Sequence, residues 1–318
     1  MPRREGHDFD YHWGLVIELY GSRKFQEALE MALEVERNFP DKWGEISLGI
    51  ASICARLGQF DSAVSTLEKA MSNGHWWSKN ELLQIPALRP LHERLDFCAL
   101  VEKCDSLQRA REESSRPELI VFTPEDGSIP RTAIITLHGR GETAQTFAPH
   151  WKRVVSIGIL LAVPGSSQPF RSEGLCWDDH ERARKEITGV YSQLLASYPK
   201  GFDHTIVAGY SQGGELALSL AIIPEFTCTG FIGVAPGPFS QAKLEELTNA
   251  LETAAPQRLK GYLFSGDKDP TLPMTMKIHE EMTMRHIQCE FKLEAGAGHS
   301  YPRDFELRLV SAVKFVLS

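Results

Sequence analysis

The segment VAGYSQGGELAL, residues 207–218, places a serine between two glycines where a run of small and β-branched residues gives way to a helical pattern. In such a sharp turn the Ser211 hydroxyl would stand clear of the strand, beside the first N–H groups of the helix. Side chains at 209 and 213 would collide with the neighbouring strand and helix, which accounts for Gly209 and Gly213. The segment predicts a nucleophile for acyl transfer at Ser211, with the Gln212 N–H as a donor to the oxyanion. A glycine-rich turn with a bystander serine is the alternative.

A serine hydroxyl needs a base, and the base needs an orienting carboxylate. Two glycine-rich loops follow apolar runs downstream of Ser211. The loop EAGAGHSYP carries His299 as the candidate base, and the loop SGDKDPTLP offers Asp267 and Asp269 as candidate carboxylates. Asp267 is also suited to cap its loop by accepting backbone N–H groups, whereas Pro270 would stiffen the turn at Asp269. Three further histidines lie away from the expected carboxyl ends of strands and are less suited as the base: His204, His279 and His286.

The elements that must position these side chains are short apolar runs rich in branched residues. Amphipathic stretches such as 182–198 and 304–317 alternate with them. This alternation predicts an α/β fold with a mostly parallel sheet and helices on both faces, and near-continuous apolar strands fit a sheet buried on both sides. Functional groups then gather at the carboxyl ends of the strands. The expected strands are 118–124, 132–139, 158–165, 204–211, 230–237, 260–267 and 289–296.

Residues 1–112 follow a different pattern and predict an all-α domain. The stretches FQEALEMALEVERNF and FDSAVSTLEKAMSNG are alike, with Phe25 and Phe60, and likewise Ala28 and Ala63, 35 residues apart. A helix and a short turn precede each stretch. This spacing resembles the tetratricopeptide repeat, in which small residues let paired helices approach closely. A generic helical bundle is the alternative.

The rest of this half supplies a closing helix and a linker. Residues 82–104 predict a degenerate closing helix, and the charged run 109–118 predicts the linker to a second domain at 117–318. The paired tryptophans within 73–83 fit core packing; a contact with the second domain or the substrate is the alternative.

The motif G-x-S-x-G at 209–213 resembles the nucleophile elbow of the α/β-hydrolase family. The resemblance implies the order serine, acid, histidine, and its loop pattern favours Asp269 as the acid that holds the histidine. The stretch LHGRGETA, after the expected strand 132–139, resembles the oxyanion loop of esterases. It implies the Arg140 amide as the second oxyanion donor, with His138 and Gly139 shaping the loop. An ordinary strand-end turn is the alternative.

Five motifs narrow the resemblance to the phospholipase/carboxylesterase branch, which includes acyl-protein thioesterases. They are LHGRGETA, GLCWDDHE, GYSQGG, SGDKDPTLP and GAGHSYP, in the order of that branch. The branch implies a cofactor-free hydrolase of esters or thioesters, with Trp177 and Tyr210 as candidates for the substrate rim. Arg140 departs from the branch, which often has an apolar residue there. The polar segment 164–176 does not indicate a long apolar channel, and Cys176 lies in no elbow and is expected to be structural or incidental.

Net charge, cysteine content and the length of apolar runs indicate which binding partners and which cellular compartment to expect. The net charge of −8 over 318 residues disfavours nucleic acid and anionic membranes as partners. Six scattered cysteines without a CxxC pair indicate reduced thiols, a cytoplasmic protein and no metal site. No apolar run reaches the length of a membrane span, and the first residues lack the apolar core of a secretory signal.

The sequence therefore predicts a cytoplasmic serine hydrolase that cleaves carboxylic esters or thioesters through an acyl-enzyme. Two alternatives stay open. One is an interaction protein whose hydrolase half is regulated or inactive, and the other is a serine peptidase. The helical half could bind a protein partner, self-associate, or cap the substrate entrance.

Overall fold

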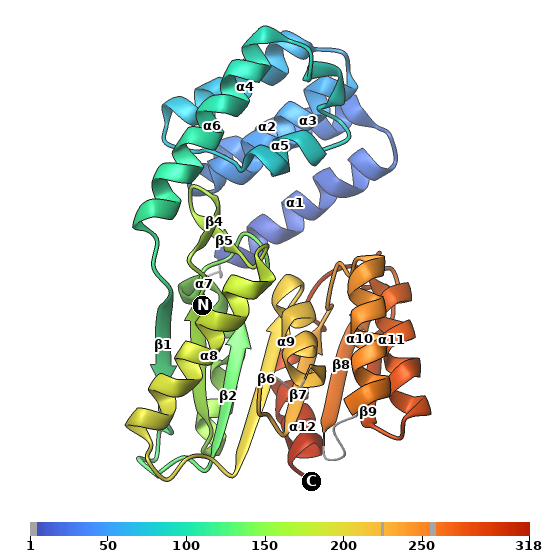
Figure 1. Cartoon of the computed structure of the whole chain (residues 1–318). Coiled ribbons are helices and arrows are strands. Elements are labelled where there is room, and N and C mark those ends of the chain that lie inside the picture. Colours follow the sequence, from blue (N-terminus) through green and yellow to red (C-terminus); the bar gives the residue numbers. More distant parts are fainter. Residues whose placement is uncertain (1–4, 224–225, 255–258) are drawn as a thin grey trace. The chain divides into compact units, whose positions relative to one another are not determined.

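The computed structural model describes residues 5–223, 226–254 and 259–318 (Figure 1). Residues 1–4, at the start of the stretch considered for a secretory signal, lie outside the described residues. The chain divides into a helical unit, Met1–Ser114 with Pro169–Ser172, and a sheet unit, Ser115–Gln168 with Glu173–Ser318. The sequence did not predict that residues 169–172 would join the helical unit.

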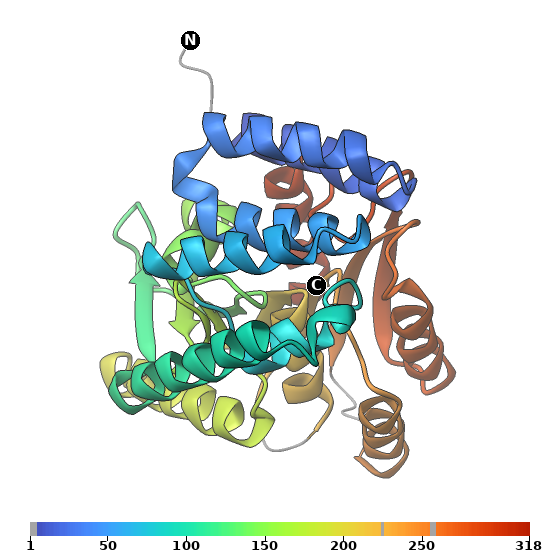
Figure 2. The same ribbon diagram turned by 90° about the horizontal axis from the view of Figure 1, so that it is seen from above.

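The helical unit begins with four helices that run antiparallel to their neighbours, and each packs against the next along the chain (Figure 2). Ala28 and Ala63 are fully buried, which permits the close approach that the repeat spacing predicts, and Phe25 and Phe60 are partly buried. The tetratricopeptide resemblance, and the protein binding or self-association it implies, stay predictions. The helices are α1 (Glu5–Gly21), α2 (Phe25–Asn38), α3 (Trp43–Arg56) and α4 (Phe60–Ser72), with a 3-10 turn, η1, at Pro40–Lys42.

The expected closing helix at 82–104 is interrupted. It is replaced by α5 (Lys79–Gln84), a 3-10 turn η2 (Arg89–Leu91) and α6 (Leu95–Ser114). Pro86 explains the first break, because a proline excludes its preceding residue from the helical region, and Pro90 prevents a continuous helix before α6.

The paired tryptophans belong to the core of the helical unit. Trp76 and Trp77 are 8% and 1% exposed, in agreement with core packing. The backbone around these tryptophans also binds the distant segment 169–172. The Ser78 N–H donates to the Phe170 carbonyl, and the Ser172 N–H donates to the Trp76 carbonyl. These bonds explain why that segment joins the helical unit.

The sheet unit contains a seven-stranded sheet in the order β1-β3-β2-β6-β7-β8-β9, and it confirms the predicted fold class (Figure 1). Only β1 runs antiparallel to its neighbour, β3. The sequence did not predict the short strands β4 (Gln168–Arg171), most of which belongs to the helical unit, and β5 (Gly174–Cys176). The seven strands are β1 (Glu118–Phe122), β2 (Thr132–Leu137), β3 (Leu160–Gly165), β6 (His204–Tyr210), β7 (Gly230–Val234), β8 (Lys260–Gly266) and β9 (Gln288–Glu294).

Helices cover both faces of the sheet, because its strands alternate apolar side chains between two buried clusters. On β2, Ala133 and Ile135 join one cluster and Ile134 joins the other. The first cluster packs under α8 (His180–Ser197), α9 (Gln212–Ile222), α10 (Gln241–Ala254) and α11 (Leu272–Met284), of which Figure 1 shows α8, α9 and α10 on the near side. The second packs under α7 (Ala144–Trp151), the 3-10 helix η3 (Lys152–Ile157) and α12 (Phe305–Leu317).

The parallel register brings the carboxyl ends of β2, β6, β7, β8 and β9 to one edge of the sheet. Leu137 pairs with Gly209, Tyr210 with Val234, and Gly266 with Glu294. The loops that follow these strands carry the residues singled out from the sequence. Within the residues that the structure describes, no helix combines the length and hydropathy needed to cross a bilayer.

Candidate active site

Ser211 occupies the turn between β6 and α9 in a backbone conformation that residues with a side chain rarely adopt. Its φ is 53° and its ψ is −121°. Such a conformation costs about 1–3 kcal/mol and persists only where its surroundings hold it. Here the Ser211 N–H donates to the Val234 carbonyl at 2.9 Å, and the Gly237 N–H donates to the Ser211 carbonyl at 3.1 Å. The strain is thus stored at the residue predicted to be the nucleophile.

The two glycines of the motif are required by close backbone contacts. A Cβ atom at Gly209 would lie 2.3 Å from the carbonyl oxygen of Gly213. A Cβ at Gly213 would lie 2.1 Å from the carbonyl oxygen of Leu137, at the end of β2. No Cβ fits at such distances, so α9 can begin this close to β2 and β6 only with glycine at both positions.

The structure brings Ser211, His299 and Asp269 together. The Ser211 Oγ lies 2.8 Å from the His299 Nε2, and the His299 Nδ1 lies 3.1 and 3.0 Å from the two carboxylate oxygens of Asp269. Asp269 is 4% exposed, and its Oδ1 also accepts the N–H and the hydroxyl of Thr271, each at 2.8 Å. These contacts fix the carboxylate against the imidazole and orient the imidazole toward the serine.

The acid and histidine loops meet because their backbones cross closely at the end of β8. A Cβ at Gly266 would lie 2.1 Å from the Ala297 carbonyl oxygen, so glycine permits the crossing. The Lys268 N–H donates to the same carbonyl at 2.9 Å. Asp267 accepts the Gly296 N–H at 2.8 Å, a loop-capping contact of the kind expected from the sequence.

The loop after β2 has a well-defined path on both sides of Arg140. The Gly139 N–H donates to the Glu142 carboxylate at 2.7 Å, and the Glu142 N–H donates back to the Gly139 carbonyl at 3.2 Å. The Gly141 N–H donates to the Leu175 carbonyl at 2.8 Å. Burial raises the pKa of the Glu142 carboxyl, and the bond from Gly139 opposes that rise. Glu142 was not among the predicted residues, although its place three residues after Gly139 is a usable signal for a local side-chain-to-backbone bond.

His138 stabilises this loop from the interior. Its Nε2 accepts the Ser166 N–H at 3.2 Å, so a neutral ring carries its proton on Nδ1 and donates it to the Gly139 carbonyl at 2.9 Å. The side chain is fully buried, and desolvation lowers the pKa of His138 to about 4. A buried neutral ring fits a loop-shaping role rather than proton transfer.

Burial of His138 makes stability depend on pH. The unfolded chain takes up this proton near pH 6.5 and the folded chain only near pH 4, so the stability from His138 is complete above the unfolded pKa and falls as the solution is acidified. Between about pH 7.5 and about pH 5 the free energy of unfolding should fall by about 2 kcal/mol more in the wild type than in His138→Asn. Urea unfolding of both proteins measures this. Parallel pH curves would contradict a neutral buried His138.

Trp177 ties the loop after β2 to the start of α9. Its indole N–H donates to the His138 carbonyl and its backbone N–H to the Gln212 Oε1, each at 2.9 Å. The Gln212 Nε2 donates to Asp178 at 2.7 Å, and the Arg140 guanidinium pairs with the same carboxylate. Trp177 is fully buried, so it does not form the substrate rim that the sequence suggested. The role of Asp178 as a bridge between two loops was also missed.

Tyr210 contacts the histidine loop as well as the loop after β2. Its hydroxyl donates to the His299 carbonyl at 3.0 Å, and its ring stacks on Tyr301 with 4.5 Å between centroids. A Cβ at Gly139 would lie 3.0 Å from the Tyr210 ring. Tyr210 is partly exposed and its polar end faces the protein, which fits a positioning role; its place at the substrate rim stays a prediction.

The groups set aside on sequence grounds lie apart from the Ser211–His299–Asp269 contacts. His204 begins β6 at the opposite end from Ser211, His279 lies within α11, and His286 follows that helix. Cys176 is buried, and desolvation raises the pKa of its thiol to about 12, with the Asp178 charge as a lesser cause. A thiol with that pKa is protonated at neutral pH and is a poor nucleophile.

The chain matches no protein-family model and no curated protein. Solved structures do resemble it. An uncharacterized protein from Bacillus cereus ATCC 10987 is 24% identical with a TM-score of 0.55, and the match covers 97% of this chain and 99% of that one. Esterase PE8 is 16% identical with a TM-score of 0.51, covering 63% and 99%. Acyl-protein thioesterase 2 of Zea mays is 17% identical with a TM-score of 0.50, also covering 63% and 99%. At these identities the similarity establishes the fold: an α/β-hydrolase fold preceded by a helical segment.

Proposed function

We propose that this protein is a serine hydrolase that cleaves carboxylic esters or thioesters, of the kind found in the phospholipase/carboxylesterase branch. One observation carries the proposal: a serine in a strained turn at the carboxyl edge of the sheet is hydrogen-bonded to an imidazole that a buried carboxylate holds. Nucleophile, base and orienting acid are the three groups that acyl transfer needs, and their loops are fixed by independent backbone contacts.

The proposed reaction has two acyl-transfer steps. The Ser211 oxygen attacks the carbonyl carbon while His299 Nε2 takes its proton, and the C–O or C–S bond breaks as the imidazolium returns that proton to the leaving alcohol or thiol. Water then attacks the acyl-serine by the same route and releases the acid. Asp269 keeps the His299 proton on Nδ1, and the backbone amides of Arg140 and Gln212 stabilise the oxyanion.

Helix geometry supports the Gln212 part of this proposal. Gln212 is the first residue of α9, where an N–H has no carbonyl one turn earlier to bond and the helix dipole is positive. The Gln212 side chain is held by Trp177 and Asp178, which keeps the helix start in place. For Arg140, support comes from the fixed loop on both sides of it and from the resemblance to the esterase oxyanion loop.

The polar segment 164–176 does not argue against an apolar acyl group. Ser167 is buried and bonds the Glu186 carboxylate through both its N–H and its hydroxyl. Gln168 is buried and bonds the backbone of Asp179 at both ends of its amide. Because these polar groups are satisfied inside the fold, their presence in the sequence does not describe the lining of a substrate channel.

A covalent probe combined with a substrate series tests the proposal. A fluorophosphonate should add one phosphonyl group per chain, and mass spectrometry of the digest should locate it on the peptide that contains Ser211. Acyl esters and thioesters of rising chain length should then be turned over, and probe-treated protein should lose that activity in proportion to labelling. A label on another residue, or full turnover by fully labelled protein, would refute the proposal.

The positioning role of Tyr210 predicts a loss in turnover without a loss in binding. Tyr210→Phe removes the bond to the His299 carbonyl, a contribution of about 0.5–1.5 kcal/mol, and kcat should fall by about two- to tenfold with KM unchanged. Tyr191→Phe is the matched control, because the Tyr191 hydroxyl contacts Thr205 in α8 packing and not the site. Steady-state kinetics separates the outcomes. A raised KM with unchanged kcat would instead favour the rim role for Tyr210.

A further inference from the structure

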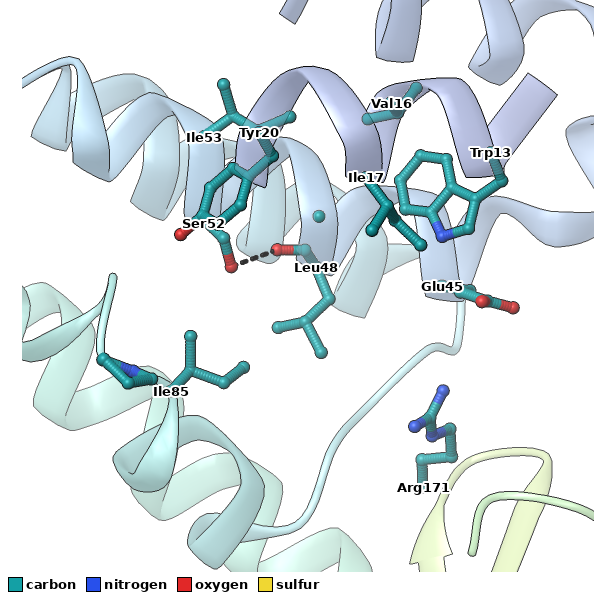
Figure 3. A pocket seen from close by; sticks show the side chains of 12 residues that line it. Trp13, Val16, Ile17, Tyr20, Glu45, Leu48, Ser52, Ile53, Ile85 and Arg171 are labelled. Atoms are coloured by element: carbon teal, nitrogen blue, oxygen red, sulfur yellow. Dashed lines mark hydrogen bonds between the residues drawn. The ribbon is translucent and has the colours of Figure 1, made fainter. Parts of the chain in front are cut away.

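The helical unit contains a pocket of about 430 Å³ that the proposed chemistry does not use (Figure 3). Its walls come from α1 and α3, from the residues after α5, and from Arg171 of the segment 169–172. A volume of this size is in the range of small-molecule sites.

The walls of the pocket are mostly apolar. Trp13 and Ile17 line it from α1, Leu48 from α3 and Ile85 from the opposite side (Figure 3). Ile17 is 59% exposed, which leaves apolar surface open to water. Gly49 lets the Trp13 ring pack closely against α3, because a Cβ there would lie 2.6 Å from that ring. These side chains would accept an alkyl or aryl group.

Arg171 provides the polar end. Backbone bonds to residues 76 and 78 hold its segment, and Figure 3 shows the guanidinium pointing toward Glu45 of α3, with Trp13 of α1 beyond it. Its Nη2 donates to Glu81 at 2.9 Å, whereas its Nε is buried and has no hydrogen-bond partner among the described residues. The Nε–H is enclosed by protein atoms, so a ligand in the pocket would contact the Nη side of the guanidinium.

The charged residues that line the pocket indicate which hydrogen-bond acceptor a ligand would carry. Of the lining residues that the structure describes, only Arg171 and Glu45 are charged. The Arg171 side chain is 26% exposed, whereas Glu45 is an exposed residue whose charge water and salt screen. Glu81 accepts one N–H of Arg171 Nη2, and the remaining Nη hydrogens suit a carboxylate.

We propose that this pocket binds a carboxylate that carries an apolar chain, with the chain between α1 and α3 and the carboxylate on Arg171. The proposal is independent of the hydrolase activity, because the ligand is bound and not transformed. It nevertheless has the chemistry of the acid that ester hydrolysis releases, so the pocket would let the helical unit respond to such a product.

Calorimetric titration with sodium octanoate tests the pocket, with octanol and octylammonium as probes of equal chain length and different charge. Octanoate should bind about tenfold more tightly than either, which corresponds to about 1.4 kcal/mol. Ile17→Glu places a negative charge at an exposed wall and should weaken octanoate by about tenfold or more. Tyr11→Glu is the matched control, since Tyr11 is 65% exposed on the same helix but does not line the pocket. It should leave the affinity unchanged.

Arg171→Met should lower the affinity for octanoate to that for octanol. If loss of the ion pair with Glu81 unfolds this variant, Ile17→Glu still tests the pocket, because it leaves that pair in place. Ser211→Ala should bind octanoate as the wild type does, which separates this pocket from the proposed active site. Absence of octanoate binding, equal binding of octylammonium, or binding that Ile17→Glu leaves intact would each overturn the proposal, whatever the outcome for hydrolysis.

Discussion

Ser211→Ala is expected to abolish turnover of acyl esters while leaving the protein folded. The variant lacks the only hydroxyl 2.8 Å from the His299 Nε2 among the described residues, so no acyl-enzyme can form there. In serine hydrolases the loss of the nucleophile lowers kcat on the order of 10⁵–10⁶, and the rest of the site gives a small residual rate over water. Stopped assays at high enzyme concentration, with the wild type diluted to match, measure the ratio.

A second substitution at the same position separates chemistry from backbone strain. Alanine retains the Cβ and hence the strain at φ 53°, whereas glycine tolerates that conformation. Ser211→Gly should therefore be as inactive as Ser211→Ala but more stable by about 1 kcal/mol in urea unfolding, the strain relief exceeding the entropic cost of glycine. Substantial activity in either variant would show that Ser211 is not the nucleophile. Equal stability of the two variants would contradict the backbone strain at residue 211.

Much of the site was predictable because its residues follow strands. The strand pattern that leads into Gly209 places Ser211 at the carboxyl end of a strand. Parallel strands bring their carboxyl ends to one edge of the sheet. Once the strands before Asp269 and His299 were identified, their meeting with Ser211 followed from topology. The steric need for glycine was likewise local, because the atoms that exclude a Cβ at Gly209 belong to the same turn.

What escaped prediction depends on contacts between loops that no local pattern encodes. Trp177 was expected at the substrate rim because of the motif around it, yet its ring is buried against His138. Glu142 and Asp178 hold the loop of Arg140 through bonds whose partners are set by the packing of three separate segments. Segment 169–172 joins the helical unit through backbone bonds to residues 76 and 78, and backbone bonds leave no trace in residue type.

Asp269→Asn should lower kcat by about 10⁴ for a reason that the contacts of Asp269 make specific. Its Oδ1 accepts two hydrogen bonds from Thr271, so an asparagine would keep its oxygen there and turn its NH₂ toward the His299 Nδ1. That nitrogen would then accept, and the ring proton would move to Nε2. An Nε2–H facing the Ser211 hydroxyl cannot take its proton, so the base would be lost with the fold intact.

Asp267→Asn is the matched control, because the two acids share one loop and differ in what they hold. Asp267 is exposed and accepts the Gly296 N–H, a bond that an asparagine oxygen can accept equally well, so its kcat should fall by less than about tenfold. Steady-state kinetics of both variants on one activated ester, with unfolding curves to confirm the fold, gives the comparison. If Asp267→Asn lost as much turnover as Asp269→Asn, the orienting role would belong to the loop as a whole and not to the carboxylate that contacts His299.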